Sequence, residues 1–132
     1  MVYFIISHDK ICSIMSYKIQ REPFIVPATD GKLIEEHFGL ASIKSDLSIA
    51  KMIAPPNWIE PFQVPKFDEY TYIIKGRKQF EIEGKIIILK EGQSIKINRG
   101  TRIRYSNPFD EPVEYISVCF PAFSPEKVNR EN

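Results

Sequence analysis

The two thiols are the side chains with the most reactive chemistry in this chain. Cys12 and Cys119 are its only cysteines, and Cys119 lies inside the apolar run 115–120. A thiol attacks a substrate only where its surroundings favour the thiolate, so an apolar run favours a buried, inert thiol over a nucleophile. A disulfide is not expected. Two unpaired thiols fit a reducing compartment, from which we expect a cytoplasmic location.

Aromatic side chains are the second group able to contact a ligand. A cluster of them spans positions 58–72, with a further one at 105: Trp58, Phe62, Phe67, Tyr70, Tyr72 and Tyr105. Rings stack on sugars and aromatic acids, but strands and cores contain rings in any case. Trp58 and Phe67, near the loop 65–68, are the candidates for ligand contact, whereas Phe80 is expected in the core.

Glycines at a fixed interval indicate the elements that must hold these side chains. Gly76, Gly84, Gly92 and Gly100 recur every eight residues. Glycine adopts the positive φ of tight turns, and this interval accommodates a strand of about five or six residues with its turn. The pattern therefore predicts short antiparallel strands in a sandwich or barrel.

The remaining segments also have strand character. Strands are expected at 24–26, 33–38, 47–54, 58–63, 68–75, 79–83, 85–89, 95–97, 101–106 and 113–120. Pro55 and Pro56 lack amide donors and predict a turn between strands. Ser124 before Pro125 has the pattern of a helix start, so a short helical turn is expected near the C-terminus.

Length and charge narrow the class of protein. The 132 residues, 43% of them hydrophobic, correspond to about one domain. Eighteen basic and seventeen acidic residues leave a formal charge of +1 without long runs of either sign. This balance lacks the electrostatic pattern of a protein that binds nucleic acid or an anionic membrane, and neither partner is expected.

The first residues are a separate question. The apolar start, residues 1–6, is too short for an export signal or a membrane span. Met15 is a second candidate start, so residues 1–14 are either a misassigned beginning or an extra strand. We therefore treat residues 1–20 as an N-terminal extension and residues 21–132 as the single domain.

Two spaced motifs resemble those of the cupin superfamily. The second cupin motif, G-x5-P-x-G-x2-H-x3-N, is matched in spacing by Gly92, Asn98, Gly100, Ile103 and Asn107. Here asparagine replaces the proline and isoleucine replaces the histidine. The resemblance covers about residues 45 to 120, and the ending 119–125 is similar to that of small bacterial single-domain cupins.

The first cupin motif, G-x5-H-x-H-x3,4-E-x6-G, is also recognisable. Glu69 and Gly76 have the required separation. Gln63 and Pro65 occupy the two histidine positions if three residues precede the glutamate, and Phe62 and Val64 occupy them if four do. The resemblance implies an all-β fold, a cupin-type jelly-roll barrel that is a double-stranded β-helix of two antiparallel sheets.

The departures from the motifs bear on metal binding. Cupins usually hold a metal with three histidines and one glutamate, and only Glu69 matches that set. Ile103 offers hydrocarbon where a ligand is needed, and Gln63 is a weak amide donor. His37, a lone histidine beside Phe38, is more often a surface residue than a ligand. We therefore expect no metal and no other cofactor.

The same resemblance predicts the lining of the barrel. Strand alternation from Glu69 places Thr71 and Ile73 on one inward face. The partner segment, with Ile103 at the histidine position, is expected to turn Thr101, Tyr105 and Asn107 inward and Arg102 and Arg104 outward. The candidate catalytic residues are Glu69 and Tyr105, and the candidate ligand-binding residues are Gln63, Thr71, Ile103, Asn107, Trp58 and Phe67. A desolvated carboxylate is how general acids and bases are commonly tuned, but hydrogen bonds that merely close the barrel explain Glu69 equally well.

Three functions are left open at this stage. One is a metal-independent protein that binds a small molecule, with a polar ligand such as a sugar or small organic acid in the barrel mouth, by analogy with sugar isomerases and epimerases of the superfamily that lack the histidine set. The second is a metal-dependent isomerase or oxygenase with a non-standard ligand set. The third is a non-catalytic dimeric scaffold. Enzymatic activity therefore stays undecided.

A homodimer is expected in each case. Small cupins commonly pair through sheet edges, and the apolar segment 2–6 would otherwise be an unpaired strand.

Overall fold

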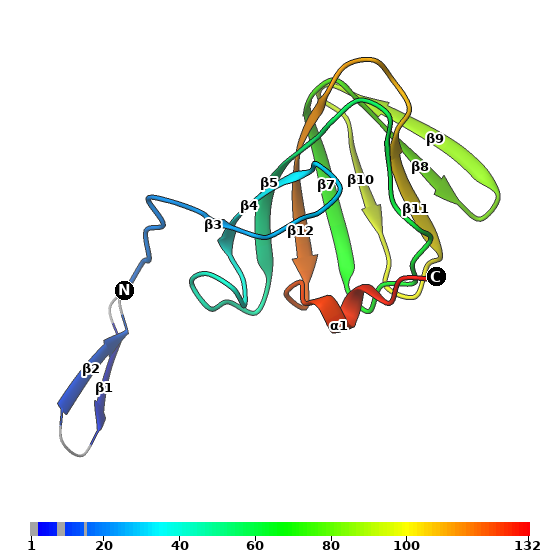
Figure 1. Ribbon diagram of the computed structural model, residues 1–132. Coiled ribbons are helices and arrows are strands. Elements are labelled where there is room, and N and C mark those ends of the chain that lie inside the picture. The colour runs from blue at the N-terminus through cyan, green and yellow to red at the C-terminus, as the bar shows by residue number, and fades with distance from the viewer. Residues whose placement is uncertain (1–2, 8–9, 15) are drawn as a thin grey trace.

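Antiparallel strands make up almost all of the regular secondary structure in this computed structural model, which describes residues 3–7, 10–14 and 16–132 (Figure 1). The strands are β1 (Tyr3–Ser7), β2 (Lys10–Ile14), β3 (Phe24–Ile25), β4 (Leu33–Phe38), β5 (Ser48–Ala54), β6 (Trp58–Ile59), β7 (Asp68–Lys75), β8 (Arg77–Ile82), β9 (Lys85–Lys90), β10 (Ser94–Ile97), β11 (Ile103–Asn107) and β12 (Val113–Phe120). In the described part of the chain the only helix is α1 (Pro125–Val128), at the predicted helical turn. It is far too short and too polar to cross a membrane.

Two sheets enclose the barrel. The larger has six strands in the order β10-β7-β12-β5-β4-β3, and the smaller has four in the order β6-β11-β8-β9, with neighbouring strands antiparallel throughout. The sheets face each other in Figure 1. The predicted all-β jelly roll of two antiparallel sheets is confirmed.

The interior combines a packed apolar core with buried polar side chains. Strand β12 begins with Val113 and Tyr115 on its buried face and ends with Ser117 and Cys119 on the same face. The packed core contains Ala54, Trp58, Ile73, Phe80, Ile97, Ile103, Tyr105, Val113 and Tyr115. Phe80 is fully buried there, as expected. The inward face of β12 thus changes from large apolar side chains to small polar ones toward its C-terminal end.

Gly76 marks the point where the chain passes from the larger sheet to the smaller one. It adopts φ +84°, and a Cβ on it would lie 2.5 Å from the carbonyl oxygen of Pro112. No other residue type fits this turn without displacing backbone. The turn starts β8 with Lys78 on the buried face, two residues before Phe80.

One expected strand is wrong. Instead of continuing from 58 to 63, β6 ends at Ile59, and Gln63 forms isolated bridges to Ile103 and to Arg130. Pro61 interrupts the strand because it has no amide hydrogen to donate. The other expected strands agree with the observed ones within about two residues at each end.

The N-terminal segment pairs within itself, because β1 and β2 form an antiparallel hairpin. The alternative start at Met15 and the residues Met1 and Val2 lie outside the described residues, as does the side chain of Cys12.

Candidate functional site

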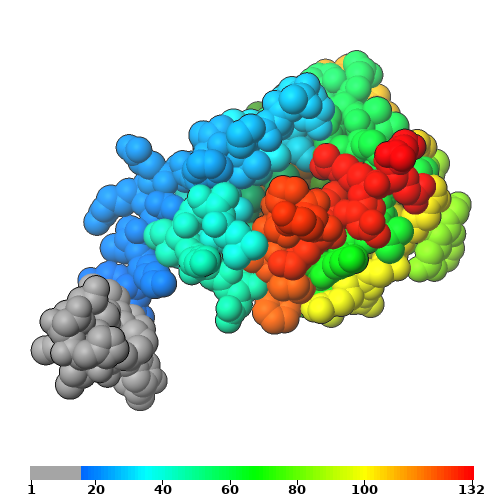
Figure 2. Space-filling model, turned by 60° about the horizontal axis from the view of Figure 1, so that its bottom comes forward, coloured from blue at the N-terminus to red at the C-terminus, as the bar shows by residue number. Residues whose placement is uncertain are grey.

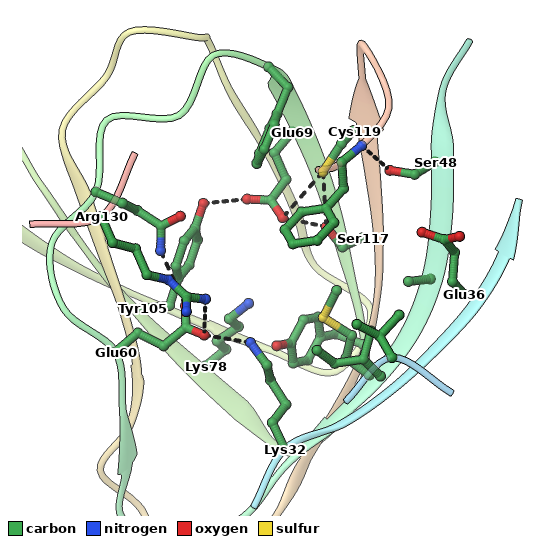
Figure 3. A pocket seen from close by; sticks show the side chains of 18 of the residues that line it. Lys32, Glu36, Ser48, Glu60, Glu69, Lys78, Tyr105, Ser117, Cys119 and Arg130 are labelled. Atoms are coloured by element: carbon green, nitrogen blue, oxygen red, sulfur yellow. Dashed lines mark hydrogen bonds and ion pairs between the residues drawn. The ribbon is translucent and has the colours of Figure 1, made fainter. Parts of the chain in front are cut away.

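A cavity of about 60 Å³ lies between the two sheets, and its wall combines several charged side chains with a larger share of apolar ones. Both sheets and the C-terminal segment contribute to its wall: Val26, Lys32, Ile34, Glu36, Ser48, Ala50, Met52, Trp58, Glu60, Gln63, Phe67, Glu69, Lys78, Tyr105, Tyr115, Ser117, Cys119, Phe123 and Arg130. Figure 3 shows the charged groups converging on this space from several elements. Its volume holds roughly four or five water molecules, or a ligand of few non-hydrogen atoms.

Glu69 is the centre of the first polar group. The hydroxyl of Tyr105 on β11 donates a hydrogen bond to one carboxylate oxygen, and the hydroxyl of Ser117 on β12 donates to the other. The Cys119 sulfur lies 3.9 Å from the same carboxylate. Because Glu69 belongs to the larger sheet and Tyr105 to the smaller one, this hydrogen bond joins the two walls of the barrel.

Protonation in this group follows from burial. Burial, reinforced by the charge of Glu69, raises the pKa of Tyr105 well above its ordinary value. The same two causes raise the pKa of the Cys119 thiol. Tyr105 therefore remains a hydrogen-bond donor at neutral pH. Cys119 is buried and remains a thiol, as its apolar sequence context predicted.

Glu60 is the centre of the second polar group. Its Oε2 lies 2.6 Å from the ammonium nitrogen of Lys32 and 3.0 Å from a guanidinium nitrogen of Arg130, and its Oε1 accepts a hydrogen bond from Gln63 at 3.2 Å. The side chain of Glu60 is 5% exposed and that of Arg130 is 47% exposed. The ion pairs therefore extend from the interior of the barrel to its surface.

These ion pairs also border an outer groove. The groove has a volume of about 470 Å³, and Val26, Lys32, Ile34, Glu60, Phe123 and Arg130 line both the groove and the inner cavity. In Figure 2 a hollow lies between the blue segment before β4 and the orange-red C-terminal segment. We interpret the groove as the entrance to the cavity, with Glu60 and its partners at the boundary.

Lys78 is the third polar group. It is 2% exposed, and its Nζ lies 3.6 Å from the ring centroid of Tyr115 and 4.6 Å from that of Tyr105. Burial lowers the pKa of Lys78 to about 7, although the charge of Glu69 opposes this shift. The site thus contains an amine that is partly neutral at physiological pH.

The structure brings together most of the site residues expected from the sequence. Glu69, Tyr105, Gln63, Trp58 and Phe67 all line the cavity. Trp58 is anchored there because its indole nitrogen donates to Asp30 at 2.7 Å.

Four residues expected on the cavity wall do not line it. Thr71 and Ile103 are buried but do not line the cavity, Ile103 as part of the packed core, and Thr101 is only half-buried. Asn107 instead donates to the backbone carbonyls of Pro55 and Glu111 at 3.1 and 2.8 Å. Alternation was applied correctly, but it does not reveal how far along the barrel the packed core ends.

Arg102 and Arg104 face outward as expected, and they pair with Glu131 and Glu81 respectively. Both guanidinium groups also lie over the Phe62 ring, at 3.8 and 4.5 Å from its centroid. Phe62 therefore contacts the outer arginines and does not line the cavity.

Sequence reasoning missed several functional candidates. Lys78 could have been found from the sequence. It lies two residues before Phe80, which was assigned to the core, so strand alternation places both side chains on the same inward face. Glu60, Lys32 and Arg130 come from distant loops and carry no local signal. Ser117 lies two residues before Cys119 and shares its face by alternation.

The residues around Glu69 do not suit the transition metal that the cupin resemblance implies at this position. Both oxygens of Glu69 already accept hydrogen bonds from hydroxyl groups, and Ile103 is hydrocarbon in the packed core. Within residues 3–7, 10–14 and 16–132, no three His, Cys, Asp or Glu side chains converge as a metal-binding group. The donor chemistry at Glu69 is that of a hydrogen-bonded carboxylate.

Comparison with known proteins identifies the family. The family model described as a cupin domain matches residues 51–119, which is more than half of the chain. The chain belongs to the cupin family. A solved RmlC-like cupin from Shewanella frigidimarina NCIMB 400 superposes on this cupin with a TM-score of 0.66 at 14% identity, over 83% of this chain and 93% of the other. The polyketide cyclase RemF from Streptomyces resistomycificus superposes with a TM-score of 0.65 at 12% identity, over 86% and 89% of the two chains.

A longer protein shows greater identity in sequence. Endoribonuclease YbeY from Myxococcus xanthus (strain DK1622) is 39% identical over 112 residues, which are 84% of this cupin but only 38% of the Myxococcus protein. The cupin thus spans about two fifths of that relative, whose name describes the whole protein. These two structural neighbours, at 14% and 12% identity, show the fold alone.

Proposed function

We propose that this cupin binds a small polar metabolite, such as a short organic acid or a small sugar, inside the barrel and without a transition metal. The observation that carries the proposal is the internal cavity, on which the charged side chains of Glu60, Glu69 and Lys78 converge among apolar ones. A concave site with a mainly apolar wall and a few convergent polar groups is the usual form of a small-molecule site.

The cavity wall suggests a division of roles. Glu69 and Tyr105 form a hydrogen-bonded pair that can exchange a proton with a bound molecule. Trp58 and Phe67 provide apolar surface for the carbon skeleton of the ligand, and Gln63 provides an amide. In this proposal Glu69 and Tyr105 are the catalytic candidates.

Removal of one hydroxyl tests this site. Tyr105→Phe keeps the ring but removes the hydrogen bond to Glu69, and we expect it to weaken binding about tenfold, the effect of one lost hydrogen bond. The measurement is isothermal titration of organic acids and sugars that are first found to raise the melting temperature of the wild-type protein. Tyr70→Phe, on an exposed ring of the outer sheet face, is the matched control and should bind like wild type. Equal affinity in both variants would place the ligand elsewhere.

Metal analysis tests the proposal that the ligand is bound without a transition metal. We expect protein purified without chelators to contain far less than one equivalent of Fe, Mn, Ni or Zn by elemental analysis. A stoichiometric metal that is lost in Glu69→Ala would favour the metal-dependent enzyme instead. Ile103→His is not expected to create tight binding, because it adds one imidazole to a carboxylate that already accepts two hydrogen bonds.

We also propose that the cupin forms a homodimer through the outer face of the larger sheet. Tyr70 and Tyr72 on β7 are exposed there and lie opposite Val118 and Ile116 on β12, so the apolar side chains form a continuous surface. Outward positions of a solvated sheet are normally polar.

A charge placed in this surface tests the dimer. We expect Ile116→Lys to convert the dimer into a monomer by light scattering at micromolar concentration. Ile86→Lys, on an exposed position of β9 in the other sheet, should leave the mass unchanged. A monomeric wild-type protein would contradict the proposal.

A further inference from the structure

Lys78 is a buried charged group that has no stabilising polar partner. No hydrogen bond or ion pair to its Nζ is found in the described part of the chain, and its close neighbours are the rings of Tyr115, Tyr105 and Phe80. Lysines are rarely buried without a partner, because the charged form loses its hydration. An amine on a cavity wall in this state is available to a bound molecule.

The surroundings of Lys78 favour a neutral amine. With the pKa lowered to about 7 by burial, roughly half of the molecules carry the free amine at neutral pH. A neutral amine attacks carbonyl carbon, whereas a solvated ammonium does not. The titratable groups that influence Lys78 come from every wall of the cavity: Glu69, Lys32, Glu60 and Cys119, with the protonated hydroxyls of Tyr105 and Tyr115.

A proton source lies in the same cavity. Figure 3 shows the Lys78 amine pointing into the space that the Glu69–Tyr105 pair borders from the other side. Addition of an amine to a carbonyl gives a carbinolamine, which loses water only when an acid protonates its hydroxyl group. Nucleophile and proton donor therefore face the same cavity.

We propose that Lys78 forms an imine with a small aldehyde or 2-oxo acid, an inference that rests on the proposed function and specifies its ligand class. The Nζ lone pair attacks the carbonyl carbon, and one N–H proton moves to the carbonyl oxygen to give the carbinolamine. The Glu69–Tyr105 pair delivers a proton to that hydroxyl, which leaves as water. The second N–H proton returns to the pair as the C=N bond forms, so the step is a condensation with no net redox change.

The volume of the cavity and the charges at its entrance narrow the class of carbonyl compound. A cavity of about 60 Å³ suits a molecule as small as glyoxylate better than a full sugar. Arg130 and Lys32 at the entrance carry positive charge that can meet a carboxylate, and Arg130 is half-exposed to the groove. A 2-oxo acid offers both the carbonyl for Lys78 and the carboxylate for the entrance.

Reductive trapping tests the imine. The full chain is incubated with glyoxylate and sodium cyanoborohydride, which reduces an imine to a stable amine, and each lysine is quantified by peptide mass spectrometry. We expect Lys78 to react at least about tenfold faster at pH 7 than Lys85, an exposed lysine on β9 that serves as the internal control, because far more of Lys78 is neutral. The rate at Lys78 should level off above pH 7, whereas that at Lys85 should keep rising toward pH 10.

Two Lys78 variants and a calorimetric measurement distinguish failure of the imine from failure of the proposed function. Lys78→Arg and Lys78→Met should both remove the fast modification, and Lys78→Met preserves an apolar filling of the site if arginine is not accommodated. Equal rates at Lys78 and Lys85, or modification of Lys78 only in denaturant, would overturn the imine. If calorimetry shows that an organic acid or sugar binds while Lys78 stays unmodified, the proposed function stands and the imine is wrong. If nothing binds and nothing is trapped, both are wrong.

Discussion

Replacing Lys78 with methionine is expected to raise the free energy of unfolding by about 4 kcal/mol at pH 7. The pKa of this amine is 10.5 in an unperturbed lysine and about 7 in the folded protein. At a pH between these two pKa values, Lys78 binds a proton in the unfolded chain but not in the folded one. Stability of the wild-type protein therefore rises with pH across this window, and the penalty is fully present only below pH 7. Methionine fills a similar volume without a charge.

The pH dependence distinguishes this effect from simple repacking. The advantage of Lys78→Met should fall to about 1 kcal/mol at pH 9.5, because only about one pH unit then remains below the pKa of the unfolded lysine, 10.5. The measurement is urea unfolding of both proteins at several pH values, followed by the fluorescence of Trp58. Lys85→Met, at an exposed position, should change stability by less than about 0.5 kcal/mol at every pH. A methionine variant that is less stable at all pH values would show that the ammonium is stabilised by its contacts with the rings.

Removal of the Glu60 carboxylate is expected to lower the free energy of unfolding by about 3 kcal/mol. Glu60→Ala leaves the buried ammonium of Lys32 without its counterion and frees Arg130 and Gln63 from their acceptor. A buried charge that loses its partner costs far more than an exposed one. We also expect the entrance groove to open further in this variant, because Glu60 borders both the groove and the cavity.

A surface ion pair provides the matched control. Arg102 and Glu131 form a pair of similar distance, 2.6 Å, but their side chains are 55% and 43% exposed, so Glu131→Ala should destabilise the protein far less than Glu60→Ala. The double variant Lys32→Leu with Glu60→Leu should recover much of the loss, because it removes the buried ammonium together with its counterion and leaves only the half-exposed Arg130 and the Gln63 amide without their acceptor. Denaturant midpoints at unchanged slope are the readout. A loss in Glu60→Ala no larger than that in Glu131→Ala would mean that water already screens the Glu60 pairs.

Local sequence patterns were sufficient to predict most of the strands. The segments 33–38, 68–75 and 113–120 were predicted with the boundaries that the structure has, because apolar alternation and turn glycines act within a few residues. The segment 58–63 was predicted wrongly. Its aromatic and apolar residues suit a strand, but Pro61 lacks the amide hydrogen that pairing requires.

The candidate site was predictable only in part. Motif spacing located Glu69, and alternation identified Tyr105 as its inward neighbour from the opposite strand. The same alternation placed Thr71 and Ile103 on the cavity wall, although neither lines it. The two-residue period of a strand tells whether a side chain points inward or outward. Whether an inward side chain reaches the cavity depends on how side chains from both sheets fill the barrel.

The sequence by itself determined the antiparallel strands, the turns, the cupin family and the inward direction of Glu69, because each depends on neighbours within a few positions or on a motif. Only the tertiary structure decided what surrounds those inward residues. It buried Lys78 against rings from two strands, brought Lys32 and Arg130 to Glu60 from opposite ends of the domain, and used both oxygens of Glu69 in hydrogen bonds. Desolvation and ion pairing depend on distances between segments far apart in the chain, and those distances exist only after the two sheets have closed.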